Sequence, residues 1–154
     1  MISRREFLIA TGGLAGGVGL VSRAGEARAT PAEMREAVRK VVGDAPVRPG
    51  RVKLDVPPLI DNGNSVTLSV AVESPMTPAD HVKAIHVFTE KNPLPNVVSV
   101  YLGPRSGRAR VTTRVRLADT QAVLAIAQMS DGSYWFDSAH VVVTLSACLE
   151  EGLI

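Results

Sequence analysis

The side chain in this chain best suited to covalent chemistry is the thiol of Cys148, its only cysteine. A β-branched run at residues 140–146 precedes it and is typical of a strand. Because side chains alternate along a strand, one set should face a hydrophobic core: Val141, Val143, Leu145 and Ala147. Cys148 belongs to the other set, with a histidine and two hydroxyl groups. The thiol is therefore expected just past the sheet, presented on its wetter side.

The start of the chain has the pattern of a secretory signal. Ser3-Arg4-Arg5-Glu6-Phe7-Leu8 precedes an apolar, glycine-rich stretch at residues 9–21, and Ala27-Arg28-Ala29 offers small residues for cleavage. The paired arginines followed by Phe and Leu indicate the twin-arginine route, which exports folded proteins. The apolar stretch is shorter than the roughly 20 residues that span a bilayer, which disfavours a membrane anchor. Residues 1–29 are therefore predicted to be a cleaved signal, and the mature chain to be periplasmic.

The charge balance changes when this signal is removed. The full chain carries 17 basic and 15 acidic side chains, and cleavage after residue 29 leaves 13 of each. A neutral mature protein offers no electrostatic basis for binding nucleic acid or an anionic membrane. We therefore expect no nucleic-acid partner and no stable membrane association.

The residues alone leave three states of the thiol open. A solitary cysteine is most often a small buried hydrophobe. In an oxidising compartment it has no partner for an internal disulfide, so it is buried, paired with another molecule or kept as a reactive thiol. Three features favour a functional thiol. The protein is predicted to be exported, Cys148 lies near the carboxy terminus, and it belongs to the polar face of the strand.

No other catalytic constellation is recognisable in the sequence. His81, His86 and His140 are scattered, and no histidine, cysteine or carboxylate spacing matches a metal site. The glycines that could form a phosphate loop belong to the signal, and no nucleophile elbow is present. The sequence predicts no metal, no cofactor and no free-standing enzyme, which leaves Cys148 as the candidate for covalent chemistry.

An arginine-rich segment is the first candidate docking surface. In a strand, Arg110, Arg114 and Arg116 point the same way, opposite Val111 and Val115. Such a basic stripe is either an ordinary solvated face or a docking surface that recognises acidic partners and guides anions.

An aromatic cluster is the second candidate docking surface. Tyr134, Trp135 and Phe136 follow Asp131-Gly132 directly, so they should lie beside a turn. The cluster either fills the core at one end of the domain or exposes Tyr134 and Trp135 to a partner protein.

Residues 30–147 are predicted to form one domain, followed by a cysteine-bearing tail at 148–154. Thr30-Pro31-Ala32-Glu33 is a capping box that starts a short amphipathic helix, which Gly43 can close and which suits a sheet edge or end. From residue 51 the hydrophobic period becomes two, and turn residues separate the runs. The expected fold is all-β: an immunoglobulin-like antiparallel β-sandwich of about seven strands with one short N-terminal helix. The runs are 52–56, 66–72, 82–89, 97–102, 109–117, 122–129 and 141–146.

Five longer stretches carry a resemblance to a known family. They are Pro57-Pro58-Leu59-Ile60-Asp61-Asn62-Gly63-Asn64, Val72-Glu73-Ser74-Pro75-Met76, Ile85-His86-Val87-Phe88 with Glu90-Lys91-Asn92-Pro93, Thr113-Arg114-Val115-Arg116-Leu117-Ala118-Asp119-Thr120-Gln121, and Met129-Ser130-Asp131-Gly132. Together they resemble SoxY, the sulfur-carrier subunit of the periplasmic thiosulfate-oxidising Sox system. The resemblance runs from the signal to Cys148.

This resemblance implies a sandwich domain in a tight heterodimer with a second sandwich protein, SoxZ, that is exported with the carrier. It also implies that Cys148 holds the substrate covalently on a carboxy-terminal arm. The resemblance further implies three partner enzymes: the haem protein SoxXA, which would conjugate thiosulfate to the cysteine, the manganese enzyme SoxB, which would hydrolyse the terminal sulfonate, and the molybdenum–haem protein SoxCD, which would oxidise the remaining sulfane sulfur. By the same resemblance, the carrier itself catalyses no reaction.

The arm departs from the family pattern around Cys148. The family arm ends Gly-Gly-Cys-Gly-Gly, whereas this chain has Ser146-Ala147-Cys148-Leu149-Glu150-Glu151. Side chains in place of glycine make the tether stiffer and thicker, and two glutamates disfavour an approaching anion. Two interpretations follow: a covalent sulfur carrier with matched partner enzymes, or a SoxY-like, non-catalytic scaffold protein with an altered arm.

Overall fold

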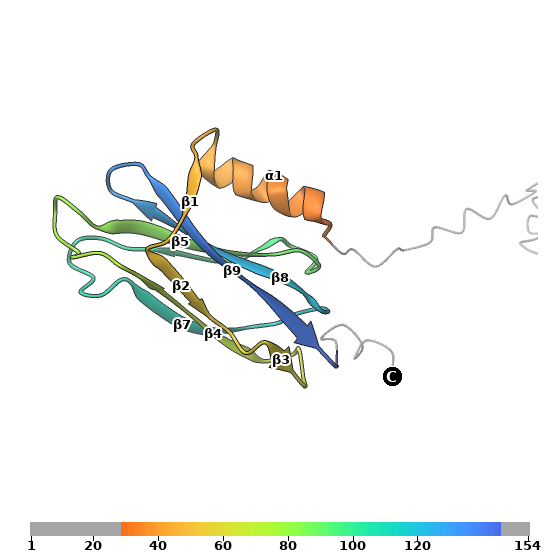
Figure 1. The fold of residues 1–154 in the computed structure, drawn as a ribbon. Helices are drawn as coiled ribbons and strands as arrows, with labels where there is room; N and C mark the ends of the chain where they lie inside the picture. Colours follow the sequence, from red (N-terminus) through yellow and green to blue (C-terminus); the bar gives the residue numbers. More distant parts are fainter. Residues whose placement is uncertain (1–28, 146–154) are drawn as a thin grey trace, which may run out of the picture.

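The computed structural model describes residues 29–145, so most of the predicted signal and the whole tail at 148–154 lie outside the described residues. The described chain forms one helix and nine strands (Figure 1). These are α1 (Pro31–Val42), β1 (Val47–Pro49), β2 (Val52–Asp55), β3 (Leu59–Ile60), β4 (Val66–Val72), β5 (Val82–Thr89), β6 (Asn96–Tyr101), β7 (Arg110–Val115), β8 (Gln121–Met129) and β9 (Tyr134–Val143).

The strands form two stacked sheets. The larger has the order β1-β9-β8-β5-β6, with β3 also paired to β9, and the smaller has the order β2-β4-β7. Neighbouring strands are antiparallel, except that β1 and β3 run parallel to β9. The immunoglobulin-like sandwich is confirmed. The count of about seven strands misses β1 and β3, because runs of three and two residues show no period.

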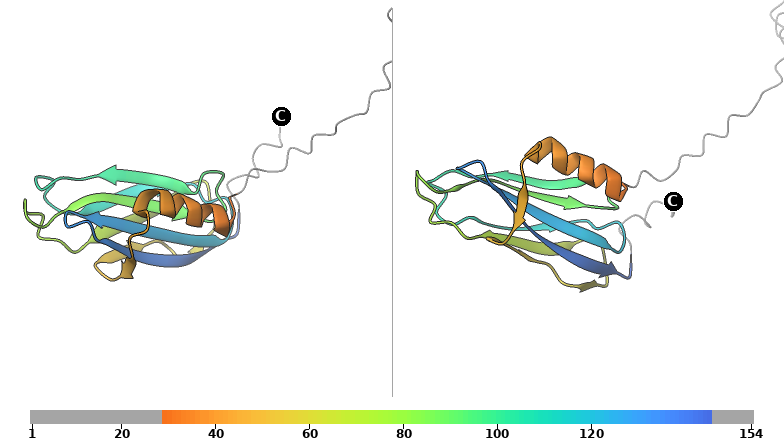
Figure 2. Two further views of the ribbon diagram at one scale, coloured as in Figure 1. Left: turned by 90° about the horizontal axis from the view of Figure 1, so that it is seen from above. Right: turned by 45° about the horizontal axis from the view of Figure 1, so that its top comes forward.

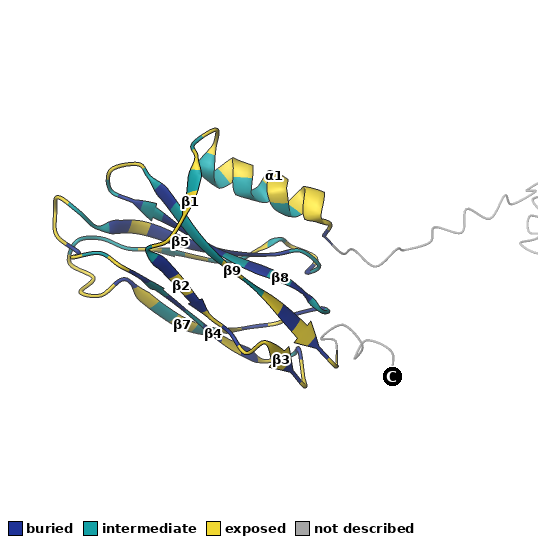
Figure 3. Cartoon of the chain, in the orientation of Figure 1, coloured by how far each residue is buried: buried dark blue, intermediate teal, exposed yellow. Residues whose placement is uncertain are grey.

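The hydrophobic core lies between the two sheets. Along β4 the residues alternate between buried and more exposed positions, with Leu68 and Val70 almost fully buried (Figure 3). From the larger sheet Val87, Val123 and Val141 enter the same core. The alternation that predicts these strands therefore also sets which face of each strand is buried.

The helix α1 covers the outer face of the larger sheet (Figure 2). The capping box is confirmed, since Thr30 Oγ1 accepts a hydrogen bond from the backbone N–H of Glu33, whose carboxylate accepts from the N–H of Thr30. The apolar side of α1 packs on Phe88, Ile126 and Tyr134. The helix was expected at a sheet edge or end. It lies on a face instead, because β5, β8 and β9 also carry large apolar side chains on the side away from the core.

The last strand is longer than predicted. β9 begins at Tyr134, and its register pairs Tyr134 with Gln128 and Val141 with Gln121 of β8. The aromatic cluster that follows the turn at Asp131 is therefore part of the central strand, which carries the chain from one end of the sandwich to the other (Figure 1).

Candidate functional site

The end of β9 is fixed by the segment at residues 58–63. Four backbone hydrogen bonds join the two: Val142 N–H to Pro58 O at 2.9 Å, Thr144 N–H to Ile60 O at 2.9 Å, Leu145 N–H to Asp61 O at 3.2 Å, and Gly63 N–H to Leu145 O at 2.8 Å. Thr144 Oγ1 also donates to Asp61 O at 3.0 Å. The bonds continue two residues past the end of β9, so Leu145 is held by both its N–H and its carbonyl group.

A second clamp holds the other side of the same strand end. Thr120 Oγ1 accepts the backbone N–H of Val143 at 3.0 Å and lies 3.4 Å from the carbonyl oxygen of Val143. Thr120 directly precedes β8, which pairs with β9 up to Val141. The strand end is therefore held between β8 and β3, and its position is set by the sandwich.

The alternation predicted around the strand end holds up to residue 144. Val141 and Val143 are buried, and His140, Val142 and Thr144 are exposed. Leu145 was expected on the core side, but it is 60% exposed. The chain bends at residues 144 and 145, so the strict alternation of an extended strand ends there.

Cys148 lies outside the described residues, three positions beyond Leu145. Three extended residues span at most about 10 Å. The clamped carbonyl of Leu145 is therefore the fixed base of a short arm, which we call the arm base.

A buried polar network stiffens the loops around the arm base. The Asn92 side chain donates to Arg116 O at 2.7 Å, and its oxygen accepts from Ala118 N–H at 2.9 Å and from Gln121 Nε2 at 3.0 Å. Gln121 is 1% exposed, and its oxygen accepts the N–H of Lys91 at 2.8 Å. Because all these groups are paired, the loops before β6 and β8 are fixed relative to each other.

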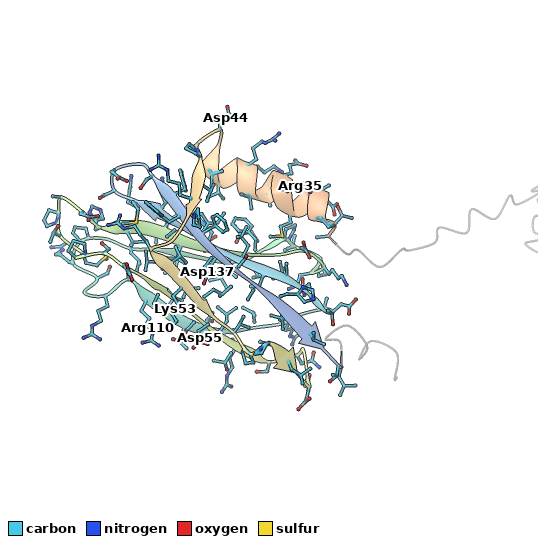
Figure 4. All side chains as sticks on the ribbon, in the orientation of Figure 1. Arg35, Asp44, Lys53, Asp55, Arg110 and Asp137 are labelled. Atoms are coloured by element: carbon cyan, nitrogen blue, oxygen red, sulfur yellow. The ribbon has the colours of Figure 1, made fainter. Side chains whose placement is uncertain are left out.

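The candidate arginines lie on one side of the smaller sheet, as their spacing predicts. Arg110 and Arg114 are exposed on β7, while Val115 is buried in the core. Arg116 follows β7 and is also exposed. Figure 4 shows Arg110 on the outer surface of that sheet, near Lys53 and Asp55 of β2. The structure thus brings the three arginines to one side, and their docking role stays a prediction.

The two candidate aromatic residues have intramolecular partners. Tyr134 is 8% exposed, and its hydroxyl group donates to Val41 O of α1 at 3.3 Å. Trp135 donates from Nε1 to Ser133 Oγ at 3.1 Å, and the Arg51 guanidinium lies 5.7 Å from its ring centroid. Burial under α1 favours the core interpretation for Tyr134. Partner docking by the pair remains untested.

His86 has a defined position that its spacing in the sequence did not indicate. It is 4% exposed on β5, its Nδ1 lies 2.8 Å from Ser99 Oγ of β6, and its ring meets Tyr101 edge-on with centroids 5.9 Å apart. Burial lowers the pKa of His86 below the usual 6.5, because a charged ring would lose its hydration there. The ring is therefore neutral at pH 7 and packs as part of the sheet.

Sequence reasoning did not predict that the segment at residues 58–63 holds the end of β9. Pro57-Pro58 and Asp61-Asn62-Gly63-Asn64 both indicate turns, and the two residues of β3 between them are too few to reveal a strand. The closest signal was the apolar pair Leu59-Ile60 between the turns.

Within residues 29–145, no group of three or more histidine, cysteine or carboxylate side chains is arranged to hold a metal ion. No helix in this part of the chain is long and apolar enough to cross a membrane.

Comparisons with known proteins place this fold. The structure of the sulfur carrier protein SoxY from Chlorobium limicola f thiosulfatophilum has a TM-score of 0.62 and 25% identity, covering 74% of this chain and 98% of that one. A superoxide reductase (neelaredoxin) from Ignicoccus hospitalis has a TM-score of 0.55 and 20% identity, covering 78% and 98%. The superoxide reductase from Nanoarchaeum equitans has a TM-score of 0.52 and 10% identity, covering 62% and 100%. At such identities, the two superoxide reductases share the fold alone.

The fold and the arm base define an immunoglobulin-like sandwich protein whose described residues end in a clamped strand. The family model for the sulfur oxidation protein SoxY matches residues 38–148, well over half of the chain, and the match extends to Cys148. The chain therefore belongs to the SoxY family of sulfur oxidation proteins. A search of curated proteins gives no significant match.

Proposed function

We propose that this protein is a periplasmic carrier that holds thiosulfate-derived sulfur intermediates on Cys148 and presents them to partner enzymes. The observation that carries the proposal is the arm base, where both backbone groups of Leu145 are hydrogen-bonded three residues before the cysteine. A rigid base with a short extension lets the thiol reach about 10 Å into a partner while the sandwich stays outside. Membership of the SoxY family supports this role.

The proposed chemistry needs only the thiol from this chain. A sulfur–sulfur bond forms between Cys148 Sγ and the sulfane sulfur of thiosulfate, the thiol proton passes to solvent, and two electrons pass to a SoxXA-like haem protein. A SoxB-like enzyme then adds water at the terminal sulfonate, which releases sulfate and leaves a persulfide on the cysteine. A SoxCD-like enzyme then takes six electrons from the remaining sulfane sulfur, which gains oxygen from water and becomes a sulfonate on the cysteine. A second hydrolysis by the SoxB-like enzyme releases this group as sulfate and restores the thiol. This protein positions the adduct, and its own residues catalyse no step.

The partners follow from the same role. We expect a heterodimer with a SoxZ-like sandwich subunit, exported together with this chain by the twin-arginine route. Folded export suits this arrangement, because a partner without its own signal can cross only when already bound.

Intact-mass measurement on protein from the periplasm of thiosulfate-grown cells tests the carrier role. We expect adducts of thiosulfate or of additional sulfur atoms that disappear in the Cys148→Ser variant. A thiol that is always unmodified under these conditions would contradict the proposal. Ser146, two positions before the cysteine, provides a matched control, since Ser146→Ala should leave the adducts in place.

The composition of the tail favours a second candidate, a non-catalytic scaffold. Where the family arm has glycine on both sides of the cysteine, this chain has Ser146 and Ala147 before it and Leu149 and Glu150 after it. Glu151 comes next, so the extension is bulkier and more acidic. In a scaffold, the heterodimer would assemble other periplasmic components without loading Cys148. The two roles separate in growth on thiosulfate: Cys148→Ala abolishes it for a carrier and leaves it intact for a scaffold, while deletion of the protein abolishes it in both cases.

A further inference from the structure

One side of the sandwich is open between the two edge strands β6 and β7. Among the described strands, β6 pairs only with β5 and β7 only with β4. A groove of about 530 Å³ runs between the two edges, with Val97, Val98 and Val115 among the residues that line it. Val115 belongs to the hydrophobic core, and Val97 and Val98 pack against that core. The groove therefore reaches the edge of the core on a side that no described segment covers.

The backbone of β7 has hydrogen-bonding groups that face this open side. Alternate residues of an antiparallel strand bond to the neighbouring strand, and the residues between them point the other way. Val72 N–H donates to Ala109 O at 2.8 Å, so the odd-numbered residues of β7 bond to β4. The N–H and carbonyl groups of Thr112 and Arg114 therefore point away from β4, toward the open side.

The residues after β7 keep this orientation. Leu117 continues the odd-numbered series and donates its N–H to Gly63 O, just before β4, at 2.8 Å. The carbonyl of Arg116 instead accepts the side chain of Asn92, which lines the groove, at 2.7 Å. The even-numbered backbone groups thus face the groove, and those of Thr112 and Arg114 take no partner from another described strand.

Two arginines lie beside this edge. Arg114 and Arg116 line the groove and are both exposed. Neither takes part in an ion pair between described residues. Arg110 is exposed on the same face of β7 but does not line the groove. The charge along the groove therefore favours an acidic partner.

The geometry of the edge sets the sequence pattern of that partner. Side chains of a strand added to β7 would point alternately to two faces. Those on one face would contact Val97 and Val98 in the groove, which suits apolar residues. Those on the other face would lie beside Arg114 and Arg116, which suits carboxylates. Residues 112–116 span roughly 17 Å, so a short segment is enough.

We propose that the open side binds an extended segment of a partner protein, in which apolar and acidic residues alternate, as an additional strand on β7. The backbone of the segment bonds to Thr112 and Arg114, its apolar side chains enter the groove, and its carboxylates pair with Arg114 and Arg116. Backbone hydrogen bonds supply affinity in such strand addition, and the alternate side chains supply specificity. This interaction goes beyond the proposed carrier function and does not depend on it.

Nuclear magnetic resonance of the protein, titrated with a synthetic peptide of alternating valine and glutamate with blocked ends, tests the strand addition. We expect saturable shift changes at Val97 and Val98. Amide exchange of Thr112 and Arg114 should slow several-fold in the bound state, because their N–H groups gain acceptors. Thr113 already bonds to β4, so its exchange should not change. An absence of saturable shifts, or shifts without slower exchange at the two amides, would overturn the proposal.

Charge reversal tests the pairing with the arginines. Arg114→Glu together with Arg116→Glu should weaken binding of the glutamate peptide by roughly tenfold and allow a valine–lysine peptide, which the unmodified protein should not bind, to bind instead. Arg110→Glu is the matched control for Arg114→Glu, because it changes the net charge equally but lies off the groove. Equal losses in these two single variants would indicate general electrostatic attraction and contradict a site in the groove.

Sedimentation of the protein without peptide distinguishes a second copy of the chain from a different partner. We expect a monomer whose groove resonances do not depend on protein concentration. A dimer, with shifts at Val97 and Val98 that grow with concentration, would show that another copy occupies the groove and would overturn the proposed partner.

Discussion

At the scale of single residues, the strand that leads to Cys148 depends on the hydroxyl group of Thr120. This hydroxyl bonds to the N–H of Val143 at 3.0 Å. We expect Thr120→Val to lower the free energy of unfolding by about 1–3 kcal/mol, because the isosteric side chain leaves a partly buried N–H without a partner. Urea denaturation measures the change. Thr112→Val, at an exposed position on β7, is the control and should be nearly neutral. Equal effects of the two substitutions would contradict the clamp.

A second residue-scale effect concerns His86 and pH. Its pKa is lowered by burial, so the unfolded chain binds a proton there at a higher pH than the folded chain. Stability is therefore full above the unfolded value of about 6.5 and falls as the pH drops from there toward the folded pKa. Thermal unfolding between about pH 7.5 and 5 measures this loss. His86→Gln, which can still bond to Ser99, should reduce the loss, and an unchanged pH profile would contradict it.

What the sequence predicts about individual residues depends on how local their contacts are. Thr30 and Glu33 are three positions apart, so their reciprocal hydrogen bonds could be predicted from the capping-box pattern alone. Thr120 and Val143 are 23 positions apart and meet only after β8 and β9 pair. The composition of the thiol site was therefore predictable, while the clamps that fix the arm base were not.

At the scale of elements, α1 contributes through its cap and its apolar side. We expect Thr30→Ala to destabilise the protein by about 1 kcal/mol, because the N–H of Glu33 loses its acceptor at the first turn. Denaturation monitored by far-ultraviolet circular dichroism measures the change. Glu33→Gln is the matched control, since its amide oxygen still accepts the N–H of Thr30. A loss as large in the control as in Thr30→Ala would argue against the capping box.

Strands could be predicted where they were long enough to show an alternation of apolar and polar residues. The seven residues of β4 alternate cleanly, and their burial follows the same alternation. The three residues of β1 and the two residues of β3 are too few to show this alternation. Both strands nevertheless extend the larger sheet at β9, and β3 forms one side of the arm base. Their positions depend on β9, which is distant in sequence, so local patterns cannot reveal them.

At the scale of the whole molecule, the sandwich has one joined side and one open side. On the joined side Asp137 connects β9 to β2, and on the open side the edges of β6 and β7 border a groove. The period-two pattern predicts two stacked sheets, but it carries no information about which edges meet. The arm base lies at the end of β9, the strand that the joined side connects to β2, so the contacts of the joined side set its position.

The last prediction concerns the hydrogen bond that joins the two sheets on the side of β9 and β2. Figure 4 labels Asp137, which accepts this bond, and Asp55, which does not. Removal of the carboxylate by Asp137→Ala leaves the N–H of Leu54 without its 2.8 Å acceptor, in a half-buried position. Hydrogen bonds to charged groups contribute about 1.5–3 kcal/mol, so we expect a loss of that size and faster amide exchange along β2. Urea denaturation and hydrogen exchange measure the two effects.

Two matched variants separate the cross-sheet bond from a general effect of charge. Asp137→Asn keeps an oxygen acceptor and should retain most of the stability. Asp55→Ala removes a carboxylate from the exposed face of β2 and should change both measurements little. If Asp55→Ala and Asp137→Ala were equally destabilising, net charge would explain the result. If only Asp137→Ala loosens β2, one hydrogen bond between β9 and β2 holds the smaller sheet against the strand that carries the arm base.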